Sequence, residues 1–245
     1  MIRTAAALII GNEILSGKIQ ERNLEVLAGE LFGLGISMRK AVVCPDEVEV
    51  IADELNALRC RYDAVFTSGG VGPTHDDVTV EAVARALSQP VVRFAELEAL
   101  LRGFFGKRLK DRHLRMADLP AGAELLRSGE GGWPAVKADN IYILPGLPEV
   151  FRRKIPILRE VLRGGAAFVN RTVLLGCDEG EVADLLDRLV KDHPEVAIGS
   201  YPIWKGSEIS VKITFDGRDA GAVDRAAEEL RKAVPETFRS DRSIP

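Results

Sequence analysis

Short apolar runs alternate with longer amphipathic segments in the N-terminal third of the sequence, and this alternation restricts the fold more than any other feature. The apolar runs are typical of strands buried on both faces, and they span residues 4–10, 36–43 and 64–67. Aliphatic residues recur at helical spacing in the segments after these runs, near residues 24–34, 48–58 and 80–87. This β-α-β-α-β-α order predicts an α/β fold in which helices cover a mostly parallel sheet.

Right-handed crossovers bring the carboxyl ends of parallel strands, and the loops that follow them, to one edge of the sheet. The loops that this rule places together are 11–18, 44–46 and 68–77. Open α/β sheets bind their ligands at this edge, so we expect the functional residues to lie there.

The glycine pair Gly164-Gly165 predicts a boundary between two domains. We expect a three-layer α/β/α domain over 1–164 and a small α+β domain of β-α-β-β-α order over 165–245. Within the first domain, the basic segment 94–116 is predicted to be helical. Such a segment is typical of a solvated face or of a helix that covers a pocket.

Charge and cysteine content restrict the partners and the compartment. The sequence has 33 Lys and Arg residues and 37 Asp and Glu residues, which gives no electrostatic case for nucleic acid or an anionic membrane as the main partner. Its three cysteines are widely spaced and predict free thiols in a reducing compartment. The first apolar run is too short for a membrane span and lacks a signal-peptide cleavage pattern, so we expect a cytoplasmic protein.

The strongest local signal is the segment 67–79, in which Gly69, Gly70 and Gly72 follow an apolar strand and precede a helix. Glycine lets backbone N–H groups approach a ligand, and a helix N-terminus favours anions, so this loop predicts a phosphate site. Its spacing matches neither the Gly-x-Gly-x-x-Gly pattern nor the Walker pattern. The alternative is a tight turn in which Asp77 is an ordinary helix cap.

Two adjacent carboxylates, Asp76 and Asp77, lie beside this predicted phosphate site. They would repel a phosphate unless a cation intervened, and hard oxygen ligands suit Mg²⁺ or Mn²⁺. The sequence contains no Gly-x-Ser-x-Gly or His-Glu-x-x-His pattern, and Cys44 has no paired histidine. We therefore expect metal-assisted attack by water rather than covalent catalysis.

Two further loops carry candidate binding residues. The first follows the first strand and leads into a helix, and the alternative is a plain turn with a capped helix. The second follows a strand near 140–144, and it is either a phosphate or ribose contact or an ordinary helix entry. Their candidate residues are Gly11, Asn12, Glu13 and Asn23 in the first, and Pro145 and Gly146 in the second.

Three single residues have both a functional and a structural interpretation. Asp46 opens the second predicted helix and either orients a ligand or caps the helix. His75 lies within the glycine loop as an acid or base, or it faces solvent. Trp133 either stacks on a purine or is a buried hydrophobic anchor.

Three segments carry a resemblance to a known family, namely 11–17 with Asn23, 68–79 and 144–149. On these motifs the chain resembles the molybdopterin-binding-domain superfamily, and specifically its CinA-like branch. The resemblance implies a three-layer α/β domain followed by a small KH-like domain. The sequence is expected to depart from CinA in lacking its C-terminal deamidase domain. It also implies functional roles for Asp77 and Asp46, which match the aspartates used in molybdopterin adenylylation.

For CinA-like members the resemblance implies metal-dependent pyrophosphate cleavage of ADP-ribose, and for the related domain of FAD synthase it implies hydrolysis of FAD. The segment 132–134, Gly-Trp-Pro, is closer to the FAD synthase form than to the Gly-x-Ala-Pro-Gly of CinA. We therefore expect a homodimeric nucleotide pyrophosphatase that acts on ADP-ribose, FAD or a similar dinucleotide. The alternatives are a molybdopterin-binding or adenylylating protein of molybdenum-cofactor synthesis, and a non-catalytic ligand-binding module.

The expected site combines catalytic, metal-binding and substrate-binding residues. Asp77 and Asp46 are the predicted catalytic residues, and Asp76 with Asp77 is predicted to hold a divalent metal ion, Mg²⁺, Mn²⁺ or Co²⁺. The expected ligand is a small nucleotide or pterin. The predicted substrate-binding residues are Gly11, Asn12, Glu13, Asn23, Ser68, Gly69, Gly70, Gly72, Thr74, Pro145 and Gly146.

Overall fold

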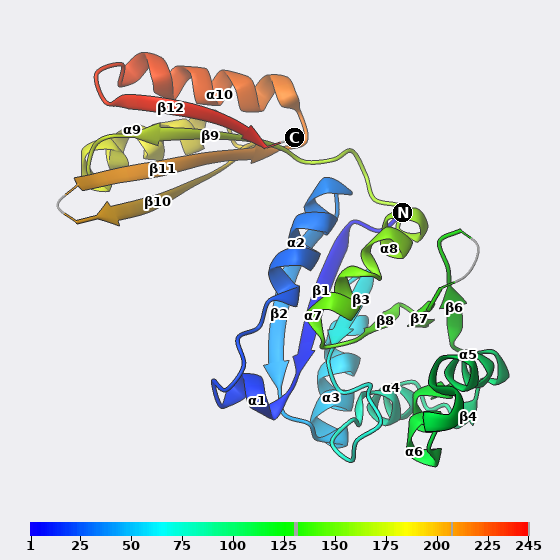
Figure 1. Ribbon diagram of the computed structural model, residues 1–245. Coiled ribbons are helices and arrows are strands. Elements are labelled where there is room, and N and C mark those ends of the chain that lie inside the picture. The colour runs from blue at the N-terminus through cyan, green and yellow to red at the C-terminus, as the bar shows by residue number, and fades with distance from the viewer. Residues whose placement is uncertain (130–131, 207, 245) are drawn as a thin grey trace. The chain divides into compact units, whose positions relative to one another are not determined.

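The structure, a computed structural model, describes residues 1–129, 132–206 and 208–244. The chain forms two compact units, Met1–Gly165 and Ala166–Pro245. Each unit has its own sheet and its own helices, as Figure 1 shows.

The first unit is built on a six-stranded sheet with the strand order β2-β1-β3-β8-β7-β6. Its parallel strands are β1 (Thr4–Ile10), β2 (Ser37–Cys44), β3 (Ala64–Ser68) and β8 (Ile141–Leu144). Two antiparallel strands complete it, β7 (Ala135–Ala138) and β6 (Glu124–Leu126). The sheet is therefore mostly parallel, as the apolar runs predict.

Helices cover both faces of this sheet, because successive residues of a strand point to opposite faces. Along β1, the odd-numbered residues of 5–9 belong to one buried cluster and the even-numbered residues of 6–10 to another. The first cluster is covered by α2 (Asn23–Gly33), α7 (Pro148–Arg152) and α8 (Ile155–Val161). The second is covered by α3 (Val48–Arg59) and α4 (Thr79–Ala86). This arrangement confirms the predicted three-layer fold.

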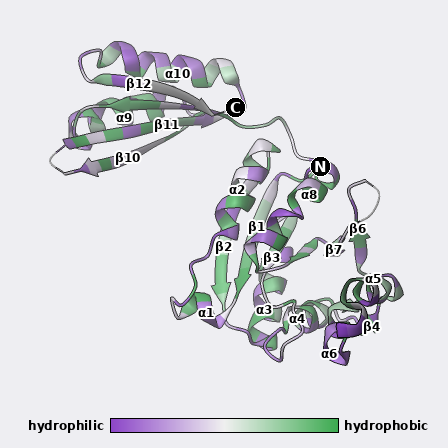
Figure 2. Ribbon diagram, viewed as in Figure 1, coloured by the Kyte–Doolittle hydropathy of each residue, from purple (hydrophilic) through white to green (hydrophobic). Residues whose placement is uncertain are grey.

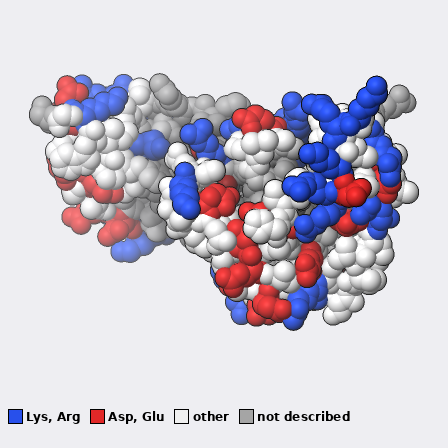
Figure 3. Space-filling view, turned by 60° about the horizontal axis from the view of Figure 1, so that its bottom comes forward, with Lys and Arg blue, Asp and Glu red and all other residues white. Residues whose placement is uncertain are grey.

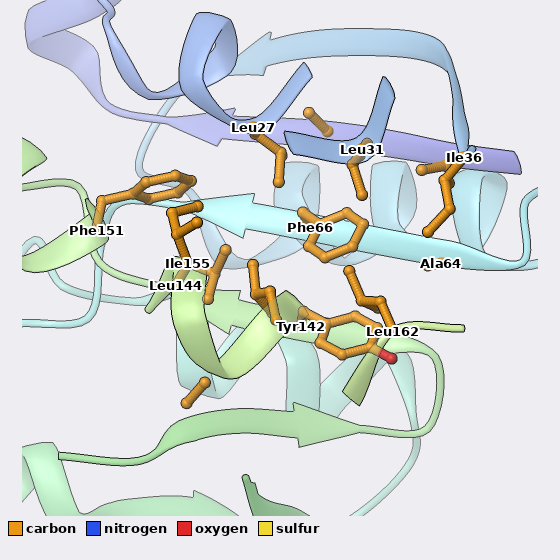
Figure 4. Packing of buried hydrophobic residues seen from close by; sticks show 14 of the residues in the cluster. Leu27, Leu31, Ile36, Ala64, Phe66, Tyr142, Leu144, Phe151, Ile155 and Leu162 are labelled. Atoms are coloured by element: carbon orange, nitrogen blue, oxygen red, sulfur yellow. The ribbon is translucent and has the colours of Figure 1, made fainter. Parts of the chain in front are cut away.

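Phe66 of β3 lies at the centre of the first cluster. Its ring stacks on the ring of Tyr142 from β8 with the centroids 4.8 Å apart, and Leu27 and Leu31 of α2 belong to the same cluster (Figure 4). In Figure 2, α2 carries both hydrophobic and hydrophilic segments, as expected for a helix with one side on the sheet. The aromatic stack therefore links two neighbouring strands of the parallel half to the helix layer above them.

A small subdomain extends the first unit beyond its sheet. It contains the two-stranded pair β4 (Val91–Arg93) and β5 (Asp118–Pro120), and the helices α5 (Ala95–Phe105), η1 (Gly106–Arg108), α6 (Asp111–Leu114) and η2 (Arg115–Ala117). A separate cluster holds it together through Leu97, Leu101, Ala117 and Leu119. The basic segment is thus helical as predicted, although it is divided into several short helices.

The second unit is a four-stranded antiparallel sheet with two helices, in the strand order β10-β11-β9-β12. Its elements are β9 (Val169–Leu175), α9 (Glu179–Asp192), β10 (Ala197–Lys205), β11 (Glu208–Gly217), α10 (Ala220–Ala233) and β12 (Phe238–Ile244). The predicted β-α-β-β-α order is present. The last strand, β12, was not predicted, because the sequence of 238–244 is mostly polar and lacks the alternation typical of a strand.

The helices of the described residues are short. The longest, α9 and α10, have 14 residues each. A helix needs about 20 apolar residues to cross a bilayer. No helix in the described part of the chain has the length and apolar character of a membrane span.

We expect the substitution Phe66→Ala to lower the free energy of unfolding of the first unit by about 3–5 kcal/mol, because it leaves a cavity in the core. Chemical denaturation followed by circular dichroism measures this change. The control is Ile19→Ala, whose side chain is 57% exposed, and it should change the stability by less than about 0.5 kcal/mol. Equal losses in the two variants would contradict the central place of Phe66.

Candidate functional site

The carboxyl ends of β1, β2, β3 and β8 meet at one edge of the sheet, because these strands pair in parallel. Backbone hydrogen bonds continue past the strand ends: the N–H of Gly11 donates to the carbonyl of Cys44 at 3.2 Å, and the N–H of Gly69 donates to that of Leu144 at 3.3 Å. The loops that begin at Gly11, Gly69 and Pro145 therefore lie side by side. The parallel pairing of the strands thus brings together the three loops that the predicted site needs.

The glycine loop approaches its neighbours too closely for any side chain. Gly69 and Gly70 have φ values of +111° and +64°, a region that L-residues rarely adopt. A Cβ atom on Gly69 would lie 2.2 Å from the carbonyl oxygen of Ile10, and one on Gly146 would lie 3.1 Å from the Cα of Gly69. These glycines thus allow the backbones of three loops to touch.

Asp77 holds the second half of the glycine loop. Its Oδ1 accepts a hydrogen bond of 2.6 Å from the N–H of Gly72, and its Oδ2 accepts from the N–H and the hydroxyl of Thr74. The alternative of Asp77 as a helix cap is wrong, because α4 begins at Thr79 after Val78 and no side chain caps it. Asp77 instead closes the loop on itself.

This geometry changes which backbone groups can bind a phosphate. The N–H groups of Gly69 and Gly72 donate within the protein, so these two members of the predicted cradle are occupied. Over the described residues, the N–H groups of Gly70 and Val71 have no acceptor. An anion at this loop would therefore be bound by the two consecutive N–H groups of Gly70 and Val71.

Asp46 and Asn23 join the loops to one another. Oδ2 of Asp46 accepts a hydrogen bond of 2.7 Å from the N–H of Asn12, at the start of the short helix α1 (Asn12–Leu15). Asp46 is not a helix cap either, because α3 begins at Val48 and has no side-chain cap. Nδ2 of Asn23, which is only 4% exposed, donates to the hydroxyl of Ser68 at 2.9 Å and to the carbonyl of Gly146 at 2.8 Å.

A cavity of about 340 Å³ opens beside the glycine loop. Asp118 at its wall forms an ion pair with Arg93, so Asp77, Glu81 and Arg115 set the charge of the cavity. Figure 3 shows that charges of both signs cover one face of the molecule, with several Lys and Arg side chains grouped at its right-hand side. Inside the cavity, in contrast, carboxylates outnumber cations, so a phosphate would need a positive ion beside it.

Arg115 is a functional candidate that the sequence did not reveal. Its Nη1 donates to the carbonyl of Thr74 at 3.2 Å, and its side chain lines the cavity together with Asp77. In the sequence it is one of many cations in a basic helical segment, and no local motif assigns it to the glycine loop. Only the folded subdomain brings this guanidinium to the glycine loop.

Asp76 and Asp77 are the two carboxylates that the sequence predicts to hold a divalent metal ion. Both carboxylates lie at the hydroxyl of Thr74. Hydrogen bonds from this hydroxyl, and then from the backbone N–H of Asp76 itself, lower the pKa of Asp76. Over the described residues no group of three or more His, Cys, Asp or Glu side chains gathers at one point. A site with two carboxylates suits Mg²⁺, which takes its other ligands from phosphates and water.

The remaining candidates lie nearby with less defined roles. The carboxylate of Glu13 lies next to Gly11: a Cβ atom added to Gly11 would be 2.5 Å from Oε1 of Glu13. The side chain of His75 is 97% exposed, and its Nδ1 lies 3.9 Å from Oδ1 of Asp76. Burial, and then the charges of Glu54 and Asp46, raise the pKa of Cys44 to about 12, so this thiol is not a nucleophile.

We expect Asn23→Ala to lower the free energy of unfolding by about 1–3 kcal/mol, because it leaves the Ser68 hydroxyl and the Gly146 carbonyl without their buried donor. Equilibrium denaturation measures the loss. Asn12→Ala is the matched control, since the Asn12 side chain is exposed and only its backbone N–H is bonded. A loss of the same size in both variants would show that the Asn23 amide does not join the loops.

The chain is similar in sequence to known proteins. Residues 6–164 match the family described as a probable molybdopterin binding domain, and residues 167–242 match the middle domain of FAD synthase. A protein from Archaeoglobus fulgidus is 32% identical over 92% of this chain and 95% of its own length. A CinA-like protein from Frankia casuarinae is 32% identical over 95% of this chain. The match covers only 57% of the length of that protein.

The fold of the first unit also has a solved relative. The crystal structure of the protein CinA from Thermoplasma acidophilum has a TM-score of 0.59 and 26% identity, and it covers 65% of this chain and 97% of its own. The family match extends over well more than half of the chain and includes all the loops of the candidate site. The chain therefore belongs to the family of probable molybdopterin-binding domains, as its loop motifs predict, and it has CinA-like proteins among its relatives.

Proposed function

We propose that the protein is a divalent-metal-dependent nucleotide pyrophosphatase that cleaves ADP-ribose, FAD or a similar dinucleotide. The observation that carries the proposal is the meeting of two unoccupied backbone N–H groups, at Gly70 and Val71, with the carboxylates of Asp76 and Asp77 on one loop. Such a loop offers both an anion cradle and a place for a cation. A diphosphate bridged to the protein by a metal ion needs this combination.

In the proposed reaction, water attacks one phosphorus of the diphosphate, and the bond from that phosphorus to the bridging oxygen breaks. The products are AMP and a second monophosphate. The N–H groups of Gly70 and Val71 would bind one phosphate, and Arg115 would contact it from the cavity wall. Asp76 and Asp77 would hold the metal, which supplies Lewis-acid stabilisation of the charge on the transferred phosphoryl group.

Asp46 is the proposed positioning group for the ligand or for the attacking water. One of its oxygens accepts the N–H of Asn12, so the carboxylate is fixed at the junction of the first two loops. A fixed carboxylate can orient a water molecule with little loss of entropy during the reaction. Glu13 lies on the same short helix and would shape the same side of the pocket.

The match of residues 167–242 to the middle domain of FAD synthase supports FAD among the candidate substrates. The family description of residues 6–164 supports a second candidate function, the binding or adenylylation of molybdopterin. A non-catalytic ligand-binding module is a third, because the loop geometry alone would also bind an anion. All three use the same pocket and differ in what happens to the bound molecule.

The following assay separates the three functions. Purified protein is incubated with ADP-ribose, with FAD, or with molybdopterin plus ATP, each with Mg²⁺, Mn²⁺ or Co²⁺ and with a chelator. Metal-dependent release of AMP from a dinucleotide supports the pyrophosphatase, and transfer of AMP to the pterin supports the adenylylating protein. Saturable binding without turnover in every mixture supports the binding module.

We expect Asp76→Asn to lower metal-dependent turnover by about 100-fold, because the metal loses a charged ligand. The side chain of Asp76 is 58% exposed, so the free energy of unfolding should stay within about 0.5 kcal/mol of the wild type. Asp77→Asn should lower turnover as well, but it should also destabilise the loop by about 1–3 kcal/mol.

Asp53→Asn is the control for these two variants, since Asp53 is an exposed carboxylate on α3, away from the glycine loop. It should leave turnover and stability unchanged. If Asp76→Asn keeps the turnover of the wild type, the Asp76 carboxylate is not a ligand of the proposed metal ion. Turnover that persists in the chelator would contradict the metal dependence.

The proposal extends to the assembly and the compartment. We propose a cytoplasmic homodimer, an expectation that comes from the family resemblance and from the free thiols of the chain. Light scattering coupled to size-exclusion chromatography measures the mass in solution. A mass equal to that of a single chain at all concentrations would exclude the dimer.

A further inference from the structure

A second cavity, of about 560 Å³, lies in the first unit and shares no lining residue with the cavity at the glycine loop. It is lined by α5 on one side and by residues of α7, α8 and the segment between them on the other. Most of its lining side chains are apolar or aromatic, among them Leu101, Phe104, Met116, Trp133 and Ile157. This size and lining are typical of a site for a small organic molecule.

Two of the lining aromatic side chains are exposed. The side chains of Phe104 and Trp133 are large and apolar, and these residues are 61% and 38% exposed. Their rings meet edge to face with the centroids 5.8 Å apart, so one element of the subdomain touches the segment before β7. These two rings are adjacent rather than scattered, and the faces of aromatic rings can stack on a flat ring.

A buried cation also lines this cavity. Lys154 is only 7% exposed, and its Nζ donates to the backbone carbonyls of Trp133 at 2.9 Å and Pro134 at 2.7 Å. Over the described residues no carboxylate forms an ion pair with it. Burial, and then the positive charge of Arg127, lower the pKa of Lys154 to about 8.

The two carbonyls do not neutralise this charge. An ammonium group has three N–H donors, and the carbonyls of Trp133 and Pro134 accept only two of them. A buried charge without a counter-charge is costly, so such groups usually have an anionic partner. Arg153, the residue before Lys154, also lines the cavity, and within the described residues no carboxylate pairs with it.

The charged groups around Lys154 give the cavity a positive end. Arg127 forms an ion pair with Glu96, which neutralises part of its charge, and it also donates to the carbonyl of Gly132. The carboxylate of Glu160 accepts a hydrogen bond from the hydroxyl of Ser128 at the cavity wall. Lys154 and Arg153 are thus the two cations that line this cavity, and within the described residues neither pairs with a carboxylate.

We propose that this cavity binds a planar aromatic molecule that carries an acidic group, with its ring against Phe104 and Trp133 and its anion at Lys154 and Arg153. The aromatic side chains provide the stacking surface, and the apolar lining removes the ring from water. The buried ammonium supplies the charge-assisted hydrogen bond that selects an anion over a neutral ring. This site is independent of the proposed pyrophosphatase site.

A matched pair of probes tests the proposal by fluorescence. One probe is 8-anilinonaphthalene-1-sulfonate, and the other is N-phenyl-1-naphthylamine, which has the same rings without the sulfonate. The chain has two tryptophans, so the Trp204→Phe background leaves Trp133 as the single donor for energy transfer to a bound probe. Each titration gives a dissociation constant for a probe at the ring of Trp133.

We expect saturable binding of the sulfonate probe at a single site, with about tenfold or greater preference over the neutral probe, because hydrogen bonds to charged groups are stronger than those between neutral groups. Lys154→Met should raise the dissociation constant of the sulfonate probe by about tenfold and leave that of the neutral probe unchanged. Val150→Phe, which fills the cavity, should weaken both. Arg153 is exposed, so Arg153→Met should leave the fold unchanged. This substitution should weaken the binding of the sulfonate probe only.

Lys40→Met, at an exposed lysine of β2, is the matched control and should change the dissociation constant of neither probe. Thermal unfolding of each variant, followed by circular dichroism, shows that the variant is folded. Equal affinities for the two probes, or sulfonate binding that is unchanged in both Lys154→Met and Arg153→Met, would overturn the proposal. These outcomes do not depend on any hydrolase activity, so they are distinct from a failure of the proposed function.

Discussion

The close approach of three backbones at the carboxyl ends of β1, β3 and β8 is the constraint on which the candidate site depends. Parallel pairing brings these ends together, and Gly69 then lies so near to Ile10 and Gly146 that no side chain fits between them. The aromatic stack of Phe66 on Tyr142 fixes β3 against β8 from within the core. Packing between the two strands inside the core thus helps to position the loops that follow them.

Polar side chains also hold the loops together, mostly by hydrogen bonds to backbone groups and in two places by hydrogen bonds to the hydroxyls of Ser68 and Thr74. Asp46 binds the N–H of Asn12, Asp77 binds those of Gly72 and Thr74, and Asn23 binds the carbonyl of Gly146. Asp77 holds the loop through both of its carboxylate oxygens, and in the proposed site its charge would also face the metal ion. Asp76 is more exposed and has fewer such ties, so its chemistry is separable from the fold.

The sequence was sufficient to predict the layers, the parallel sheet and the meeting of the strand-end loops, because apolar runs and helical spacing report burial directly. It did not predict which groups Asp77 and Asp46 bind, since both look like helix caps until the helices are seen to begin later, at Thr79 and Val48. Arg115 and Lys154 were missed for a related reason. Each is an ordinary cation in the sequence, and only long-range packing decides that one lines a cavity and the other is buried.

The crowding at Gly69, Gly70 and Gly146 also has a consequence for how the ligand preference of this fold can diverge. The base of the cavity is the main chain of Gly70 and Gly72, where a Cβ would lie 2.3 Å from Oγ1 of Thr79 or 2.7 Å from Oδ2 of Asp77, so the loop excludes a side chain there. The sides of the cavity, in contrast, are formed by side chains from α4 and from the subdomain, such as Glu81, Val91 and Arg115. Descendants of one ancestor can therefore exchange substrates by changing the sides while inheriting an unaltered base.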